Sequence, residues 1–382
     1  MQAALAALAA QTSVLQRRVE ALLNRHWWQP QPTALARALQ PLSALYGALL
    51  KHRLRKLGTA RPTPVPVVVV GNIVAGGAGK TPVVIALVQA LRELGWQPGV
   101  VSRGYGRDED AFGPGAVAAL ASSDPRRVGD EPLLIHLRTG APVWVARQRV
   151  DAVVALCWQH PEVDVIVADD GLQHRALARA AEVLVMDERG IGNGLLLPAG
   201  PLREPMPVSG QLPPQMRVLY SGPGTPPLRP ACRIKRSLGT ATPLQAWWQR
   251  DSSQAVPLTE LQGRPLWALA GLATPEKFFA MLESAGLQIS RHPQADHTQY
   301  LQSSPPPWPT DTPDVVTTEK DAVKLQSHAS GNTRIWVVGL DLALPGDWVA
   351  ELSSLLHASA ASAAKADTPP LPATPANSEP PP

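Results

Sequence analysis

A glycine-rich turn between an apolar run and an amphipathic segment constrains this chain more than any other feature. The run VPVVVVGN (65–72) is rich in β-branched residues, which is typical of a strand buried on both faces of a parallel sheet. The turn GGAGKT (76–81) follows, and a helix is predicted from about Thr81 to Leu94, ending at Gly95. A strand, a glycine turn with Lys-Thr and a helix, in this order, form the context that a phosphate-binding loop requires.

The glycine turn predicts a site for nucleotide phosphates. Glycines let backbone N–H groups face phosphate oxygens, and the N-terminus of the following helix adds positive potential. We expect Lys80 to reach the β- and γ-phosphates and the Thr81 hydroxyl to bind Mg²⁺. A glycine turn with an incidental lysine is the alternative. The predicted ATP-binding residues are Val74, Ala75, Gly76, Gly77, Ala78, Gly79, Lys80 and Thr81.

Strands alternate with helices after this turn. Strands are predicted at 99–102, 141–146, 163–169 and 182–187, with a helix at 148–159. This alternation predicts right-handed crossovers and a P-loop NTPase-like α/β fold, a parallel sheet with helices on both faces.

A second, smaller α/β pattern begins later in the chain. Strands are predicted at 264–271, 314–318 and 334–340, and Thr274 is expected to cap a helix that runs to about Ser284. The sequence therefore predicts a second, smaller α/β domain.

Two aspartates end another apolar run, VDVIVADD. A carboxylate at the carboxyl end of a parallel strand lies where nucleotides bind in open α/β sheets. We expect Asp169, Asp170 or both to hold Mg²⁺, although an Asp-Gly pair is also a common turn. Other polar clusters follow predicted strands, and each alone has a structural explanation as a cap, a turn or surface charge. They are SRGYGR (102–107), GDEP (129–132), GLQH (171–174), PLREP (201–205), ADH (295–297) and TTEKDAVK (317–324).

The N-terminal region is basic and partly apolar. Residues 1–61 hold nine Lys or Arg and one acid, Glu20, a balance of +8 in a chain whose net charge is +4. Positive charge beside apolar sequence favours a membrane surface over nucleic acid as partner. Residues 1–16 resemble an export signal, but the basic residues follow the apolar part instead of preceding it, so we interpret them as a helical extension.

The segment 33–56 has leucines and a tyrosine at steps of three and four, which place them on one helical face. Pro41 is expected to kink or restart this helix. A helix packed on its own domain and a monotopic membrane anchor both fit the residues, and no stretch is apolar enough to span a bilayer. The residues of this face are Leu35, Leu39, Leu42, Leu45, Tyr46 and Leu49. Two cysteines, Cys157 and Cys232, provide no disulfide framework and favour a reducing compartment.

The motifs together resemble the tetraacyldisaccharide 4′-kinase family of lipid A synthesis over about residues 27–340. They are GNIVAGGAGKTP, VVSRGYGR, GDEP, VADDGLQH, LPAGPLREP, ADH and TEKDAVK, in this order. The resemblance implies an ATP- and Mg²⁺-dependent kinase that phosphorylates the 4′-hydroxyl of tetraacyldisaccharide 1-phosphate to give lipid IVA. It further implies a monotopic enzyme at the cytoplasmic face of the bacterial inner membrane. The expected partners are the lipid A disaccharide 1-phosphate and an anionic membrane surface, with no nucleic acid and no obligatory protein partner.

The resemblance also implies residue roles. Asp130 is expected to deprotonate the acceptor hydroxyl as the partner of His297, with Lys80 as the third catalytic residue. The family does not use glycine at the position of Val74. Residues expected to support the phosphates, the metal or the acceptor are Tyr105, Glu131, Arg149, His174, Arg203 and Glu204.

A base paired with a histidine of the second domain implies that the two domains close over ATP. The predicted domains are a helical extension (1–26), a basic amphipathic membrane-associating segment (27–61), a P-loop kinase core (62–210), a connector (211–262), a smaller α/β domain (263–350) and a disordered tail (357–382). A P-loop switch or metallochaperone hydrolase is the main alternative function, and a membrane-surface binding module without enzyme activity is another.

Overall fold

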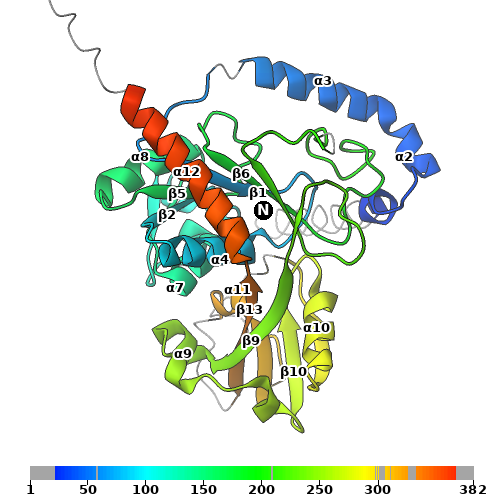
Figure 1. Ribbon diagram of the computed structural model, residues 1–382. Coiled ribbons are helices and arrows are strands. Elements are labelled where there is room, and N and C mark those ends of the chain that lie inside the picture. The colour runs from blue at the N-terminus through cyan, green and yellow to red at the C-terminus, as the bar shows by residue number, and fades with distance from the viewer. Residues whose placement is uncertain are drawn as a thin grey trace, which may run out of the picture.

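The computed structural model describes residues 22–56, 59–207, 210–296, 298, 300, 306–309, 311–325 and 333–366. Two β-sheets organise these residues, the larger in the upper half of Figure 1 and the smaller in the lower half. Each sheet has its own apolar core, so the chain forms two α/β units.

The larger sheet has the strand order β3-β4-β2-β5-β1-β6-β7-β8, and all neighbours are parallel except β3 and β4. Every residue of β1, β2, β5 and β6 is buried, as the continuous apolar runs predict. The strands are β1 (Val67–Gly71), β2 (Pro98–Ser102), β3 (Val117–Ala119), β4 (Val143–Val145), β5 (Val165–Asp169), β6 (Ala181–Met186), β7 (Met216–Tyr220) and β8 (Cys232–Arg233).

Helices cover both faces of the larger sheet. Leu87 of α4, Leu133 of α7 and Leu352 of α12 share one apolar core, and Leu156 of α8 lies in the other. The predicted P-loop-type α/β fold is thereby confirmed. The helices are α4 (Lys80–Glu93), α5 (Glu109–Phe112), α6 (Pro125–Val128), α7 (Asp130–Thr139), α8 (Arg149–Gln159) and α12 (Gly346–Ala366).

The smaller sheet has the order β11-β10-β12-β13-β9, with β9 antiparallel to β13 and the other pairs parallel. Its strands are β9 (Lys235–Pro243), β10 (Pro265–Ala270), β11 (Gln288–Pro293), β12 (Asp314–Thr318) and β13 (Arg334–Ala343). Its helices are α9 (Leu244–Gln249), α10 (Pro275–Ser284) and α11 (Glu319–Ala322), with 3-10 turns at Ser252–Gln254 and Leu258–Leu261. The α10 helix begins where predicted, but the Thr274 side chain makes no capping hydrogen bond.

The prediction that residues 211–262 form a connector is wrong. Strands β7 and β8 complete the larger sheet, and β9 leaves it to become the edge strand of the smaller one (Figure 1). Strand β9 is only partly buried and antiparallel, so it has no continuous apolar run for sequence reasoning to find. Helix α12 then returns the chain to the larger sheet, beside α4.

The prediction that disorder begins at residue 357 is also wrong, because α12 continues to Ala366. Leu352 and Leu356 of this helix are fully buried in the core of the larger sheet, and they anchor the Ala- and Ser-rich turns that follow. Residues 367–382 of the predicted tail lie outside the described residues.

The N-terminal segment folds as two helices, α2 (Ala34–Ala38) and α3 (Gln40–Lys56), which run along the top of Figure 1. The break at Leu39 precedes Pro41, as predicted. Residues 22–27 are helical, and the rest of the predicted extension, 1–21, lies outside the described residues. Of the helices that the structure describes, none is both long and apolar enough to cross a membrane.

Helix α3 packs through one side on the first domain, the α/β unit that contains the larger sheet. The Ser43 hydroxyl donates to the Leu196 carbonyl at 2.8 Å, and the Tyr46 hydroxyl donates to the Arg203 carbonyl at 2.7 Å. Tyr46 therefore faces the domain, although the sequence grouped it with the leucines. The leucine row Leu42, Leu45 and Leu49 remains 52%, 57% and 59% exposed.

Candidate active site

The phosphate-loop residues lie between β1 and α4, as predicted. Gly79 precedes α4 with φ 73°, a left-handed conformation that favours glycine. Asn72, directly after β1, is fully buried, and its side-chain amide donates to the Gly76 carbonyl at 3.2 Å. Its Oδ1 accepts a hydrogen bond from Lys80 Nζ at 3.3 Å. Asn72 thus orients both the loop and its lysine, a role that sequence reasoning missed.

Asp170 follows β5 and contacts three positively charged side chains. Its Oδ1 lies 3.4 Å from Lys80 Nζ and 3.4 Å from Arg203 Nη1, while its carbonyl accepts from Arg149 Nη2 at 2.9 Å. Burial alone would raise the pKa of Asp170, but Lys80, Arg203 and Arg149 hold it below its ordinary value. Asp170 is therefore ionised. Its backbone has φ 45°, in the left-handed region.

Asp169, the last residue of β5, has a different environment. It is 1% exposed, and its Oδ2 accepts from the Ser102 hydroxyl at 3.0 Å. Its Oδ1 is buried and has no hydrogen-bond partner within the described part of the chain. Burial, with Glu131 and Asp170 nearby, raises the pKa of Asp169 to about 7. A buried carboxylate oxygen without a donor fits a bound cation, since Mg²⁺ prefers oxygen ligands.

The protein alone provides few ligands for such a cation. Among the described residues there is no cluster of three or more His, Cys, Asp or Glu side chains that could hold a metal. Mg²⁺ in phosphate-transfer sites typically takes one or two protein ligands, with waters and substrate phosphates completing the shell. The Asp169 carboxylate, as a single protein ligand, is compatible with that pattern.

Asp130 is the first residue of α7, after Gly129 at φ 93°. It is buried, and its Oδ1 accepts a hydrogen bond from the Glu131 backbone N–H at 3.0 Å. His297 lies outside the described residues, but its neighbour Asp296 is described. Lys320 contacts both motifs: its Nζ lies 2.9 Å from Glu131 Oε1 and 3.0 Å from Asp296 Oδ1. The structure therefore brings the GDE and ADH motifs to one lysine, which sequence reasoning did not single out.

Glu204 is buried behind the phosphate loop. It accepts hydrogen bonds from Gln173 Nε2 and Arg175 Nη2, both at 3.0 Å. Gln173 Nε2 also donates to the Asn72 carbonyl at 3.0 Å. Glu204 therefore connects the PLREP segment to the residue that orients Lys80. Gln173 belongs to the GLQH motif, and nothing in the sequence distinguished it from its neighbours.

His174 and Tyr105 lie at the edge of these contacts. No hydrogen bond from the His174 ring to Asp169 or Asp170 is present among the described residues, and its Nε2 is buried without a partner there. Tyr105 is 68% exposed on the loop after β2. Burial and four neighbouring arginines lower the pKa of the His174 ring to about 4; these are Arg149, Arg179, Arg53 and Arg103.

The second domain also contacts the phosphate loop. Arg236 of β9 donates from Nη2 to the Ala78 carbonyl at 2.9 Å, and its guanidinium occupies the space that a Cβ on Gly79 would need. A Cβ on Gly77 would lie 3.4 Å from the Ala273 methyl. Sequence reasoning missed Arg236 because it placed this residue in a connector.

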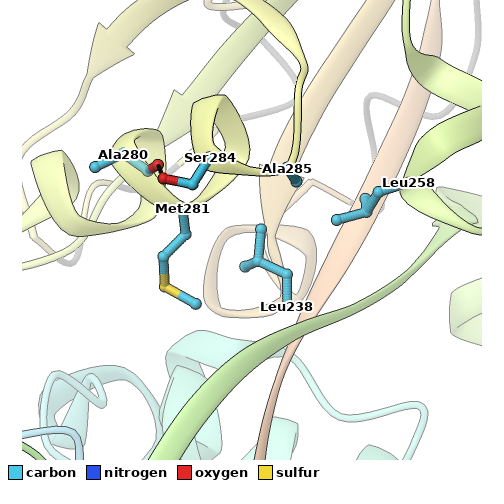
Figure 2. A pocket seen from close by; sticks show the side chains of 6 residues that line it. All are labelled: Leu238, Leu258, Ala280, Met281, Ser284 and Ala285. Atoms are coloured by element: carbon cyan, nitrogen blue, oxygen red, sulfur yellow. Dashed lines mark hydrogen bonds between the residues drawn. The ribbon is translucent and has the colours of Figure 1, made fainter.

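A separate hollow of about 420 Å³ lies in the second domain, between α10 and β9 (Figure 2). None of the predicted site residues lines it, and its side chains carry no charge. The lining residues are Leu238, Leu258, Ala280, Met281, Ser284 and Ala285. Because it offers no charged group, this hollow is not a phosphate site.

Known proteins resemble this chain over most of its length. A curated tetraacyldisaccharide 4′-kinase of Methylibium petroleiphilum is 50% identical over 348 residues, covering 88% of this chain and 94% of the relative. Its counterpart from Leptothrix cholodnii is 45% identical over 350 residues, covering 89% and 97%. A crystal structure of LpxK from Aquifex aeolicus in complex with ATP shares the fold, with a TM-score of 0.66 at 23% identity, covering 84% of this chain and 99% of that one. Residues 35–357 match the family described as Tetraacyldisaccharide-1-P 4′-kinase, and the chain belongs to this family.

Proposed function

We propose that this protein transfers the γ-phosphate of ATP to the 4′-hydroxyl of tetraacyldisaccharide 1-phosphate, giving lipid IVA. The observation that carries this proposal is the meeting of three features beside β1 and β5: a phosphate loop, an aspartate pair of which Asp169 is buried, and the acidic start of α7. Family membership supports the choice of acceptor.

The nucleotide would bind along the loop Val74–Thr81. Lys80 would contact the β- and γ-phosphates. Its ammonium group already binds two oxygens, Asp170 Oδ1 and Asn72 Oδ1, and phosphate oxygens would be further acceptors of the same kind. Mg²⁺ would be held by Thr81 with Asp169 or Asp170, and Asp169 Oδ1 has no hydrogen-bond partner among the residues that the structure describes. When bound, the ion neutralises charge that develops on the phosphates.

Asp130 is the proposed general base. It would accept the proton of the 4′-hydroxyl as that oxygen bonds to the γ-phosphorus, while the bond from phosphorus to the bridging oxygen breaks and ADP leaves. His297 would share or orient the charge on Asp130. General-base assistance contributes about 10²–10⁴-fold in rate. The remaining acceleration comes from positioning and charge stabilisation, because the phosphoryl transition state is loose.

Residues at the edge of the site would hold the acceptor. Arg203 and Arg149 both contact Asp170, so their positive charge would lie beside the transferred phosphate. Glu204 would orient the backbone at Asn72 through Gln173. Tyr105 is accessible to a substrate, and His174 would add a polar, uncharged group among arginines.

A lipid acceptor requires contact with a membrane, and α3 offers a surface for it. The leucine row of Leu42, Leu45 and Leu49 is exposed on the side away from Ser43, and the last turn of the helix holds Arg53 and Lys56. Apolar side chains would enter the acyl boundary while cations bind anionic head groups, at about 1 kcal/mol each. We therefore propose a monotopic enzyme at the cytoplasmic face of the inner membrane.

Transfer of label from γ-labelled ATP tests the function directly. Protein in detergent micelles with Mg²⁺ and tetraacyldisaccharide 1-phosphate should move label to the lipid. Asp130→Asn should lower kcat about 10²–10⁴-fold, whereas Asp251→Asn, at the cap of a 3-10 turn in the second domain, should not change it. Label released only as free phosphate would instead identify a hydrolase, and transfer that survives Asp130→Asn would reassign the base.

A further inference from the structure

Lys320 joins the two domains at the acidic start of α7. It lies in the short helix α11 of the second domain, and its side chain is only 14% exposed. Its Nζ contacts Glu131 Oε1 of the first domain at 2.9 Å and Asp296 Oδ1 of the second at 3.0 Å. One ammonium group therefore holds carboxylates from two domains.

Both carboxylates are next in sequence to residues with a proposed catalytic role. Glu131 directly follows Asp130, the proposed base, and Asp296 directly precedes His297, its proposed partner. Without a cation between them, the acidic groups would repel one another in a site of low dielectric constant. The bridge made by Lys320 therefore determines how closely the two motifs approach.

The side chain of Lys320 is positively charged. Burial alone would lower its pKa, but Glu131, Asp130 and Asp296 raise it above its ordinary value. The ammonium group is therefore protonated at neutral pH. A buried ion pair of this kind adds little net stability and is better explained by the geometry that it fixes.

A second ion pair between the same helices provides a comparison. Glu319, the residue before Lys320, lies 2.6 Å from Arg138 Nη1 at the other end of α7, and Arg138 also contacts Asp341 of β13 at 2.8 Å. Both pairs dock α11 on α7, but only the Lys320 pair connects to the acidic motifs. Docking and positioning can therefore be separated by mutation.

We propose that Lys320 is a positioning residue for phosphoryl transfer, which fixes Asp130 relative to the second domain by holding Glu131 and Asp296 together. This inference rests on the proposed function. It predicts an effect on the rate of the chemical step rather than on nucleotide binding, because in the described part of the chain no hydrogen bond or ion pair joins Lys320 to the phosphate loop.

Steady-state kinetics on four variants test the proposal. Lys320→Met should lower kcat about 10²-fold, with the KM for ATP within about threefold of wild type. Lys320→Arg should recover about tenfold of that loss, because the charge is restored. Arg138→Met, the docking control, should lower the thermal midpoint yet change kcat less than about fivefold. Combining Lys320→Met with Asp296→Asn should add no further loss of kcat, since both remove the same bridge.

Three results would overturn the proposal. The first is a kcat of Lys320→Met equal to that of the wild type. The second is an equal loss of kcat in Lys320→Met and Arg138→Met, because it would indicate that Lys320 only docks α11 on α7. The third is a loss of kcat in the double variant that equals the product of the losses in Lys320→Met and Asp296→Asn. If Lys320→Met does not fold by circular dichroism, Asp296→Asn alone tests the bridge, since Asp296 is exposed. A wild-type protein that transfers no phosphate to the lipid would defeat the proposed function, and this inference with it.

Discussion

Lys80 Nζ lies 3.4 Å from Asp170 Oδ1, so the first residue of α4 is paired with the residue that follows β5. The lysine side chain is 11% exposed, and its other partner is Asn72 Oδ1 at 3.3 Å. The pair connects the phosphate loop to the strand end beside β1. A single change at Lys80 should therefore affect both the phosphates and the charge of Asp170.

Replacing Lys80 by Met should remove phosphate transfer without unfolding the protein. We expect kcat to fall at least about 10²–10³-fold, the cost of losing one donor to developing charge. The pKa of Asp170 should rise at the same time, because Lys80 is the leading cation that holds it below its ordinary value. Labelled-phosphate assays measure the first effect, with exposed Lys235→Met on β9 as the control. Equal activity in both variants would refute the role of Lys80.

The two adjacent aspartates should differ in their effect on the metal requirement. Asp169 Oδ1 is unpartnered among the described residues, whereas both oxygens of Asp170 lie within 3.5 Å of Arg203 Nη1. Asp169→Asn should raise the Mg²⁺ concentration for half-maximal activity about tenfold or more. Asp170→Asn should instead lower kcat at saturating Mg²⁺. Titration of activity with Mg²⁺ separates the two, and the reverse pattern would assign the metal to Asp170.

Local patterns made much of this architecture predictable. The run at 65–72 and the GGAGKT turn define β1, the loop and α4 within a residue or two, because burial on both faces leaves a continuous apolar signal. Asp169 and Asp170 could be expected near the loop since parallel strands present their carboxyl ends at one edge. These features depend on neighbours in sequence.

Contacts between distant segments were not predictable. The partners of Lys320 are 189 and 24 positions away, and no local pattern indicates which carboxylate a lysine will meet. Arg236 was missed for the same reason, together with the weak periodicity of its edge strand. The sequence did suggest that both domains contribute to one site, and that remains a prediction; the ion pairs of Lys320 are one of the contacts between the two domains.

The exposed leucine row of α3 should determine membrane binding. Replacing Leu42, Leu45 and Leu49 together by Gln removes apolar surface worth about 1 kcal/mol each when transferred from water. Partition into anionic vesicles should fall roughly tenfold to a hundredfold, with ATP binding unchanged. Leu94→Gln, an exposed leucine at the end of α4, is the control for general surface effects. Vesicle sedimentation that gives equal binding for the triple variant and wild type would rule out this surface.

His174 should make the fold sensitive to acid. Its pKa in the folded protein is lowered to about 4, so the unfolded chain, with an ordinary value near 6.5, binds the proton first as pH falls. Stability contributed by the neutral ring is therefore present above about pH 6.5 and is lost progressively toward pH 4, by about 1–2 kcal/mol after allowance for partial solvent exposure. Denaturant unfolding of His174→Gln between pH 7 and 4 should show a flatter decline than wild type, because Gln has no proton to bind. An unchanged slope in His174→Gln would mean that the arginines around the ring do not oppose its protonation.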